Sequence, residues 1–255
     1  MKQSERLEKI IETLQRDGIV KVSEISRLLG CSEVTIRTDI RKLDEQGVLK
    51  KTYGGAVPKE DGLTVSFVPG EFFLNSAAKQ RIAQKAYDCI EHRDSIIIDD
   101  STTGCYLARY IKEHSDKHLI VVTNSLYAAA ELSLAKHVDL FVIGGQAIGT
   151  PPSTLDSFAI SALQSFNVDK AFVGVNGINL EVGLTSIGTP QMETKRAIIR
   201  SARKTYVIAD STKFGSSNLF TVCPIGQVHK IITDTGVSKD IMHLAKKLQV
   251  DINAV

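Results

Sequence analysis

Between residues 20 and 57, apolar positions recur first at helical spacing and then in alternation, which predicts two helices followed by a hairpin. The apolar side of the first helix consists of Val22, Ile25, Leu28 and Leu29. We expect Ser23 to cap this helix at its N-terminus. Gly30 is expected to end it, because glycine tolerates the left-handed conformation that closes many helices.

The second helix is predicted to begin two residues later, where Ser32 can act as its cap. Its apolar stripe consists of Ile36, Ile40 and Leu43, and Gly47 is expected to end it. Five polar residues fall off that stripe, namely Thr35, Arg37, Thr38, Arg41 and Lys42. Such side chains contact phosphate oxygens and base edges, so this face predicts binding in the major groove of DNA. The pattern alone leaves open an ordinary three-helix core with a solvated outer face.

Residues 48–57 alternate around Gly54-Gly55, which is typical of a two-stranded wing with a tight turn. Upstream, residues 4–16 have apolar positions at helical spacing and predict a helix that covers the back of the DNA-reading pair. Residues 19–22 predict a short strand beside the wing. This part of the chain is therefore predicted to be a small domain with three helices and a wing.

The apolar pattern weakens after residue 57, and Pro69-Gly70 marks a turn. We therefore expect a DNA-binding domain over residues 1–57, a linker over 58–75 and a second domain over 76–255.

In the second domain, short apolar strands alternate with helical patterns. The continuous β-branched run Ile96-Ile97-Ile98 is typical of a strand buried on both faces. Further strands are predicted at residues 119–123, 138–143, 170–175, 206–209 and 230–233, and helices at 77–92, 105–112, 126–134, 157–166, 192–202 and 239–248. This alternation predicts an α/β domain with a mainly parallel sheet and helices on both faces.

Polar residues and glycines follow the predicted strands, where parallel sheets bind their ligands. These clusters are Asp99-Asp100-Ser101-Thr102-Thr103-Gly104, Thr123-Asn124-Ser125, Gly144-Gly145, Asn176-Gly177 and Asp210-Ser211-Thr212-Lys213. The S-T-T-G stretch at a helix start suits a phosphate group, because hydroxyls and unpaired N–H groups converge there and the helix dipole favours an anion. A loop that caps its own helix is the alternative.

Charge qualifies this hypothesis, because Asp99 and Asp100 would repel an anion. We expect at least one of them to bind sugar hydroxyls or the neighbouring backbone, and Lys213 to supply positive charge. Glu193 and Lys195, in M-E-T-K-R, fit either a binding site or a solvated helix start.

Composition changes the picture little. The 255 residues are 43% hydrophobic with a net charge of +2, and residues 1–60 hold 12 Lys and Arg against 10 Asp and Glu. Bulk charge therefore gives no argument for DNA binding, which depends on the local placement of the cations.

The cysteines Cys31, Cys89, Cys105 and Cys223 are scattered, so we expect reduced thiols rather than disulfides or a zinc site. We find no signal peptide or membrane-spanning pattern, and expect a cytoplasmic protein.

The stretch V-S-E-I-S-R-L-L-G-C-S-E-V-T-I-R-T-D-I-R-K-L-D-E-Q-G, followed by K-K-T-Y-G-G-A, resembles the winged helix-turn-helix of the DeoR family of bacterial transcriptional repressors. Thr38 stands where that family usually has a second arginine, and Lys51 and Tyr53 stand where it usually has arginine and histidine. The resemblance implies that the DNA-binding residues are Ser32, Thr35, Arg37, Thr38, Arg41, Lys42, Lys50, Lys51, Tyr53 and Gly54.

The second domain resembles the sugar-phosphate sensor of the same family, which is similar in fold to ribose-5-phosphate isomerase. Matching stretches include I-I-I-D-D-S-T-T, V-V-T-N-S, D-K-A-F-V-G-V-N-G-I, M-E-T-K-R-A and I-A-D-S-T-K-F-G. The resemblance implies that the effector site contains Asp100, Ser101, Thr102, Thr103, Asn124, Gly145, Asn176, Glu193, Asp210 and Lys213. After Gly145, the proline-containing stretch Q-A-I-G-T-P-P-S-T-L-D-S departs from the glycine-containing loop of the family.

The resemblance implies a repressor of a carbohydrate-catabolism operon, and we expect it to bind double-stranded operator DNA as a homodimer or homotetramer. A phosphorylated sugar would control it, provided that the sugar binds the two states with different affinity. We expect no catalytic residue, cofactor, metal ion or membrane partner. The alternative is a sugar-phosphate isomerase with an accessory domain, in which Glu193 or Asp210 would be the general base. The DNA-reading face favours the repressor.

Overall fold

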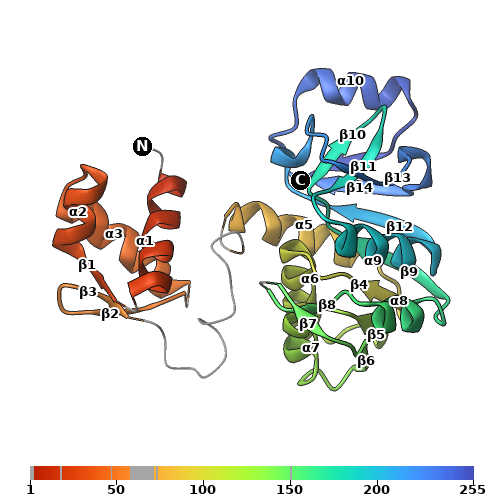
Figure 1. The fold of residues 1–255 in the computed structure, drawn as a ribbon, viewed down its shortest axis with the longest axis horizontal. Helices are drawn as coiled ribbons and strands as arrows, with labels where there is room; N and C mark the ends of the chain where they lie inside the picture. Colours follow the sequence, from red (N-terminus) through yellow and green to blue (C-terminus); the bar gives the residue numbers. More distant parts are fainter. Residues whose placement is uncertain (1–2, 18, 47, 58–71, 73, 150) are drawn as a thin grey trace. The chain divides into compact units, whose positions relative to one another are not determined.

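The computed structural model describes residues 3–17, 19–46, 48–57, 72, 74–149 and 151–255 (Figure 1). The chain divides into two compact units, Met1–Asn75 and Ser76–Val255. Most of the predicted linker lies outside the described residues, so the predicted domain boundaries stay predictions. Within the part of the chain that is described, no helix combines the length and the apolar character needed to cross a membrane.

The N-terminal unit is a three-helix bundle with a small antiparallel sheet. Its elements are α1 (Gln3–Asp17), β1 (Val20–Lys21), α2 (Val22–Leu29), α3 (Glu33–Glu45), β2 (Lys50–Thr52) and β3 (Gly55–Val57). The strands are ordered β1-β3-β2, so β1 pairs with the wing as predicted. The predicted apolar stripe of α3, Ile36, Ile40 and Leu43, is buried in the core of this unit.

The ends of the helices show which capping predictions were correct. Ser32 caps α3, accepting a hydrogen bond from the Thr35 N–H at 3.2 Å, and Gly30 ends α2 with φ of 62°. The Ser23 prediction is wrong, because α2 begins at Val22 and Lys21 occupies the cap position without a side-chain hydrogen bond. The chain passes directly from β1 into α2, which leaves no turn for a serine cap. Gly47 lies outside the described residues.

The glycine pair of the wing serves two different purposes. Gly54 has φ of 87° in the turn, where residues with a Cβ are strained. Gly55 opens β3, and a Cβ on it would lie 1.9 Å from the Val20 carbonyl oxygen of β1. The second glycine therefore lets β1 approach the wing closely.

A buried carboxylate ties α1 to α3. Asp39 is 1% exposed and accepts hydrogen bonds from Arg6 Nε at 2.7 Å and Gln3 Nε2 at 3.0 Å. Because Asp39 lies among the buried residues of α3, this contact fixes the rotation of α3 against α1.

The second unit contains a seven-stranded parallel sheet in the order β15-β14-β12-β9-β4-β5-β6. Its strands are β4 (Ser95–Ile98), β5 (Leu119–Thr123), β6 (Val138–Val142), β9 (Val168–Val173), β12 (Ala202–Ile208), β14 (Lys230–Thr233) and β15 (Ile252–Ala254). Every strand predicted in this domain is present, and Ile96, Ile97 and Ile98 are fully buried in the centre. The prediction missed β15, which is short and lies at the edge.

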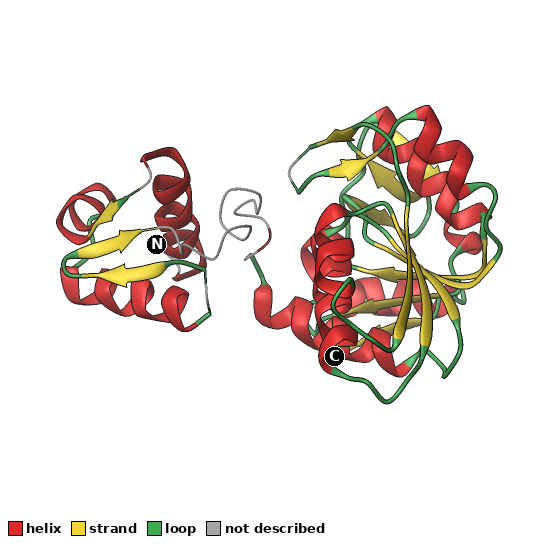
Figure 2. Ribbon diagram, turned by 90° about the horizontal axis from the view of Figure 1, so that it is seen from below, coloured by secondary structure: helices red, strands yellow, loops and turns green. Residues whose placement is uncertain are grey.

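Helices cover both faces of this sheet (Figure 2). They are α5 (Ser76–Asp88), α6 (Thr102–Glu113), α7 (Leu126–Leu132), α8 (Ser157–Leu163), α9 (Thr189–Arg200) and α10 (Lys239–Lys247). Helices α5, α6 and α7 pack in series, whereas residues of α8, α9 and α10 share one apolar core cluster. This confirms the predicted α/β architecture.

Short elements that the sequence did not predict lie at the ends of the sheet strands. They are the hairpin β7 (Ala147–Ile148) and β8 (Ser153–Thr154), the antiparallel sheet β10 (Gly177–Asn179), β11 (Gly183–Ser186) and β13 (Phe220–Cys223), and the 3-10 turns η1 (Ser211–Lys213) and η2 (Ile225–Gln227). Strands of two to four residues carry too little periodicity to be recognised in a loop.

The substitution Arg6→Met should destabilise the N-terminal unit by about 3 kcal/mol, because it leaves the buried Asp39 carboxylate without its cation. Calorimetry of the full chain should show the corresponding unfolding transition moving to lower temperature. Lys9→Met is the matched control, since Lys9 pairs with Glu12 on the surface and should leave the transition in place. Equal transition temperatures for the two variants would contradict the proposed clamp.

Candidate functional site

The exposed side of α3 carries the predicted DNA-binding residues. Arg37, Thr38, Arg41 and Lys42 are exposed, and Thr35 is half-buried, whereas Ile36, Asp39, Ile40 and Leu43 face the core. The 3.6-residue period of the helix produces this division, because positions three and four apart share a face. The structure thus keeps the predicted cationic side chains out of the core.

Two side chains on this face, Arg37 and Thr38, form hydrogen bonds within α3. Arg37 Nη2 donates to Glu33 Oε2 at 3.0 Å, one turn earlier on the exposed surface. The Thr38 hydroxyl donates to the Val34 carbonyl oxygen at 2.9 Å. Arg37 is therefore in an exchangeable surface pair, while the Thr38 proton is used within its own helix.

The wing adds cations beside α3. Lys50 and Lys51 are exposed, and the backbone N–H of Lys51 donates to Asp44 Oδ1 at 3.1 Å, which ties β2 to the end of α3. Tyr53 is fully exposed at the tip, next to Gly54. The wing therefore presents its polar and aromatic side chains to solvent.

Val34 is a surface residue that the sequence pattern did not single out. It lies in the first turn of α3 and is 73% exposed. An apolar side chain in that position can contact the methyl group of thymine in the major groove. A search for polar residues alone could not find it.

In the second unit, Asp99 is the centre of a buried polar cluster at the carboxyl end of β4. Asp99 Oδ1 accepts from the Ser101 N–H at 3.1 Å and the Ser101 hydroxyl at 2.5 Å. Asp99 Oδ2 accepts from the Gly174 N–H at 2.9 Å and from Lys195 Nζ at 2.5 Å. Asp99 therefore binds neighbouring backbone, as one of the two sequence interpretations expected.

Lys195 is the cation of this cluster. Its side chain is 6% exposed and lies 3.5 Å from Asp100 Oδ1 in addition to its contact with Asp99. Burial disfavours the ammonium, but the attraction of the two carboxylates outweighs burial and raises the pKa of Lys195. Burial also raises the pKa of Asp99, and Lys195 opposes that shift. The interpretation of M-E-T-K-R as a solvated helix start fails for Lys195.

The structure does not bring Glu193 to this cluster. Glu193 is 47% exposed and pairs with Arg196 at 3.2 Å on the outer side of α9. Residues two apart on a helix point to nearly opposite sides, so the inward position of Lys195 turns Glu193 outward. The family motif located α9 correctly but did not reveal which of its charged residues faces inward.

Ser101 connects Asp99 to the start of α6. Its hydroxyl accepts from the Gly104 N–H at 3.0 Å, so Ser101 caps α6 as the alternative interpretation expected. A Cβ on Gly174 would lie 2.5 Å from Ser101 Oγ, so glycine is required where β9 ends. Thr102 and Thr103 follow in the first turn, Thr102 half-buried and Thr103 buried.

Asn124 and Asp100 meet the hairpin β7–β8. Asn124 Nδ2 donates to the Thr154 carbonyl oxygen at 3.1 Å, and the Ser153 hydroxyl donates to Asp100 Oδ2 at 2.9 Å. Asn124 Oδ1 is buried and has no hydrogen-bond partner among the described residues. Such an orphaned acceptor can receive a ligand hydroxyl. Gly145 lies at the exposed start of this segment, where φ is 138°.

Asn176, Asp210 and Lys213 belong to a third set of contacts. The Ser216 hydroxyl donates to the Lys213 carbonyl oxygen at 3.0 Å and contacts the Asn176 carbonyl oxygen at 3.5 Å. Asp210 caps η1 by accepting from the Thr212 N–H at 3.1 Å. These contacts hold the loop that carries Lys213 beside the end of β9.

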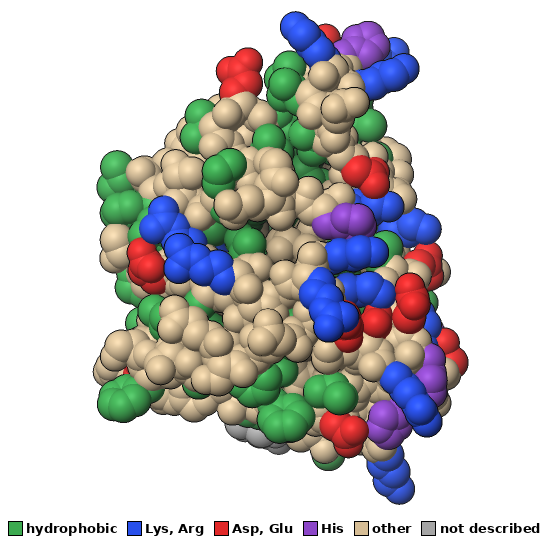
Figure 3. Space-filling view, turned by 90° about the vertical axis from the view of Figure 1, so that its right-hand side faces the viewer, with side chains coloured by type: hydrophobic (Ala, Val, Ile, Leu, Met, Phe, Trp, Pro, Cys, Tyr) green, Lys and Arg blue, Asp and Glu red, His purple; other side chains and the backbone are tan. Residues whose placement is uncertain are grey.

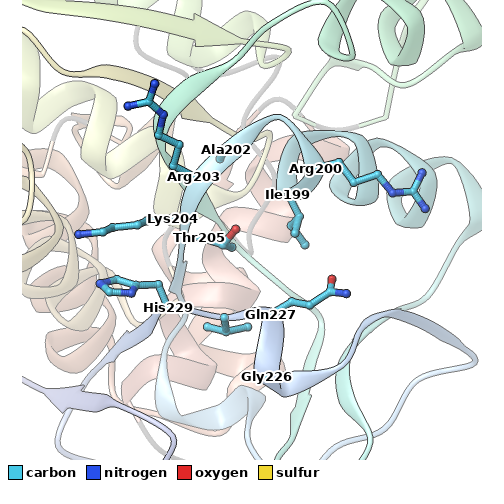
Figure 4. Close-up of a pocket in the computed structure, with 10 residues that line it drawn as sticks. Ile199, Arg200, Ala202, Arg203, Lys204, Thr205, Gly226, Gln227 and His229 are labelled. Atoms are coloured by element: carbon cyan, nitrogen blue, oxygen red, sulfur yellow. The ribbon is translucent and has the colours of Figure 1, made fainter.

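A described hollow of 520 Å³ lies away from this cluster, at the amino end of β12 and before β14 (Figure 4). Figure 4 shows Arg200 and Arg203 pointing to opposite sides of it. Arg203 also pairs with Asp169 at 3.3 Å. The cations of this hollow do not converge, so we do not assign the effector to it.

The face of the larger unit drawn in Figure 3 carries separate groups of Lys and Arg with acidic side chains among them. It shows no continuous basic surface for DNA. Among the described residues, no group of His, Cys, Asp and Glu is arranged to hold a metal ion, and the four cysteines are free.

Comparisons with known proteins agree with this architecture. Residues 6–61 match the DeoR-like helix-turn-helix domain, and residues 74–235 match the DeoR C terminal sensor domain. The chain is 33% identical over 252 residues to the "Putative aga operon transcriptional repressor" of Escherichia coli O157:H7, covering 98% of this chain and 93% of that protein. The protein therefore belongs to the DeoR family of transcriptional regulators.

Two further relatives have similar length. The "HTH-type transcriptional regulator IolR" of Bacillus subtilis is 30% identical, covering 97% of this chain and 98% of its own. The "Glycerol-3-phosphate regulon repressor" of Escherichia coli K12 is 27% identical, covering 96% of both chains. Among solved structures, ribose 5-phosphate isomerase A of Methanocaldococcus jannaschii matches with 16% identity, a TM-score of 0.41 and 55% of each chain covered.

The substitution Lys195→Met should destabilise the second unit by about 3–5 kcal/mol, because it leaves Asp99 buried without a countercharge. Urea unfolding followed by circular dichroism measures this loss. Lys213→Met is the matched control, since Lys213 is half-buried in a loop, and should change stability by about 0.5 kcal/mol or less. If Lys195→Met were as stable as the control, the ion pair would not organise the site.

Proposed function

We propose that the protein represses a carbohydrate-catabolism operon by binding operator DNA through α3 and the wing, and that a phosphorylated sugar at the carboxyl edge of the parallel sheet controls this binding. The observation that carries the proposal is that one chain combines a helix exposing Arg37, Arg41 and Lys42 with a buried polar cluster in a sensor fold. The names of the relatives, which include repressors of an aga operon and of a glycerol-3-phosphate regulon, support a sugar-related operon.

In this proposal the N-terminal part of α3 enters the major groove. Arg37 and Arg41 are exposed in α3 and have the donors that guanine and phosphate accept. Val34 is proposed to contact a thymine methyl group. Thr38 contributes less, because its hydroxyl proton is used by the Val34 carbonyl oxygen.

Lys42, Lys50 and Lys51 are exposed beside this face and are proposed to contact phosphates, with Tyr53 and Gly54 at the tip of the wing. A net charge of +2 over the whole chain gives weak general attraction to DNA. We therefore propose that a homodimer or homotetramer binds paired half-sites, which adds the contacts of two recognition helices. DNA as the partner implies a cytoplasmic protein.

The effector's phosphoryl group is proposed to bind at the first turn of α6, where Thr102 and Thr103 follow the Ser101 cap. Lys213 is proposed to add positive charge from the neighbouring loop. Asn124 and Asn176 are proposed to bind sugar hydroxyls, and the unpartnered Asn124 Oδ1 supports this role.

The isomerase alternative receives less support from the geometry. Its two candidate bases were Glu193, which is exposed and paired with Arg196, and Asp210, which is buried and hydrogen-bonded to Thr212. A general base has to face the substrate carbon. We therefore propose that the site senses its ligand without turning it over. Saturable turnover of a pentose or hexose phosphate would favour the enzyme instead.

Arg37→Ala should weaken binding to the DNA upstream of the protein's own coding sequence by about 1–3 kcal/mol, because a base or phosphate contact is lost. The exposed position of Arg37 predicts an unchanged circular dichroism spectrum. Electrophoretic shift measures the affinity, and Lys9→Met serves as the control with wild-type binding. A collapsed spectrum for Arg37→Ala would show that the assigned face is wrong.

A thermal-shift screen against sugar phosphates should identify the effector, because a ligand at 100 times its Kd adds about 2.7 kcal/mol of stability. With that ligand in hand, Lys213→Ala should retain operator binding but respond to effector only at higher concentration. Lys204→Ala is the control, an exposed lysine in β12 near the amino end of the sheet. Unchanged operator release in Lys213→Ala would remove Lys213 from the effector site.

A further inference from the structure

Asp100 differs from its neighbour Asp99 in how firmly the protein holds it. Asp99 is fully buried and its two oxygens accept from four donors. The Asp100 side chain is 15% exposed, lies 3.5 Å from Lys195 and accepts from the Ser153 hydroxyl at 2.9 Å. Asp100 is therefore the carboxylate of the pair that can leave Lys195 without unpairing a fully buried charge.

The balance of charges around Lys195 can drive Asp100 away from it. Two carboxylates face the single ammonium of Lys195, so the three side chains together carry one excess negative charge. They stand directly before the first turn of α6, where the phosphoryl group is proposed to bind. An arriving dianion is repelled by Asp100 and attracted by Lys195.

We propose that Asp100 is a resident anion that the effector's phosphoryl group displaces from Lys195, and that Ser153 passes this displacement to the hairpin β7–β8. The inference rests on the proposed function, since it assigns Lys195 and Asp100 roles within the same effector site. In this proposal Lys195 is the cation that receives the phosphoryl group. Asp100 couples the binding of that group to a movement of the hairpin.

The hairpin can respond because one of its anchoring hydrogen bonds ends on Asp100. β7 and β8 pair through Ala147 with Thr154 and Ile148 with Ser153. A two-stranded ribbon of this size has little stability of its own. Its anchors include the Ser153–Asp100 hydrogen bond and the reciprocal hydrogen bonds between Asn124 and Thr154. The Leu126 N–H also donates to the Pro152 carbonyl oxygen, and the Thr154 hydroxyl donates to the Ile143 carbonyl oxygen. The Ser153–Asp100 hydrogen bond is the anchor that links the hairpin to the Asp100–Lys195 pair, so its loss removes that link while the other anchors remain.

An alternative role for Asp100, as a ligand of the sugar, predicts a different effect of its substitution on phosphate binding. If Asp100 accepted hydrogen bonds from the sugar, removing its charge would leave inorganic phosphate binding unchanged and weaken binding of the sugar. As a resident anion, Asp100 opposes phosphate itself. Asp100→Asn keeps the shape of the side chain and removes the charge, so the sign of its effect on phosphate binding separates the two roles.

The experiment titrates inorganic phosphate into the full-length wild-type protein, Asp100→Asn and Ser153→Ala at constant ionic strength, using calorimetry or phosphorus NMR. Asp100→Asn should bind phosphate at least about tenfold more tightly than wild type. Asp139→Asn is the matched control, because it removes the same charge from an exposed residue of β6 that pairs with His118. This variant should bind phosphate like wild type.

Hydrogen exchange of the hairpin amides provides the second readout. Phosphate should speed exchange at Thr154 in the wild type, whereas Ser153→Ala should exchange fast at the start and change little on adding phosphate. Equal or weaker phosphate binding by Asp100→Asn would overturn the displacement while leaving the proposed function intact. Tighter binding without any change in hairpin exchange would overturn the coupling. Absence of phosphate binding in every variant would overturn the proposed phosphate site and this inference with it.

Discussion

The burial of Asp99 is the constraint on which the sensor unit depends. A carboxylate removed from water must recover its lost hydration through hydrogen bonds and a countercharge. Asp99 recovers it from α6, from the end of β9 and from α9, through Ser101, Gly174 and Lys195. Three segments far apart in the sequence are thereby held at one point of the sheet edge. The same contacts hold the first turn of α6, Asp100 and Lys195 beside one another.

The DNA-binding unit uses the same principle on a smaller scale. Asp39 is buried in α3 and takes its hydrogen bonds from Arg6 and Gln3 of α1. A helix held by apolar contacts alone can rotate by a few degrees as its core repacks, whereas a bidentate ion pair allows one orientation. Arg37 and Arg41 point outward because Asp39, Ile36 and Ile40 point inward. The contacts between α1 and the buried side of α3 thus fix the orientation of the exposed side of α3.

Most of the fold could be predicted from local patterns. The stripe of α3, the buried run of β4 and the alternation of strands and helices follow from periods of 3.6 and 2 residues, which short windows of sequence contain. The pairs Arg6–Asp39 and Lys195–Asp99 join residues 33 and 96 positions apart, and no window contains both partners. For the same reason the sequence could not show that α9 turns Lys195 inward and Glu193 outward. Ser23 failed as a cap because β1 pairs with β3, a contact that the local sequence does not encode.

The contact between Gly174 and Ser101 limits how such a sensor can change during evolution. Even the smallest side chain at position 174 would push its Cβ to 2.2 Å from the Ser101 Cβ and force β9 away from α6. A side chain at position 174 is therefore excluded unless Ser101 moves with it. The hairpin β7–β8 and the turn η1 are not part of this contact, so their sequences can change without disturbing it. Under the proposed function, a lineage could in this way exchange one sugar for another while Gly174 and Ser101 stay the same.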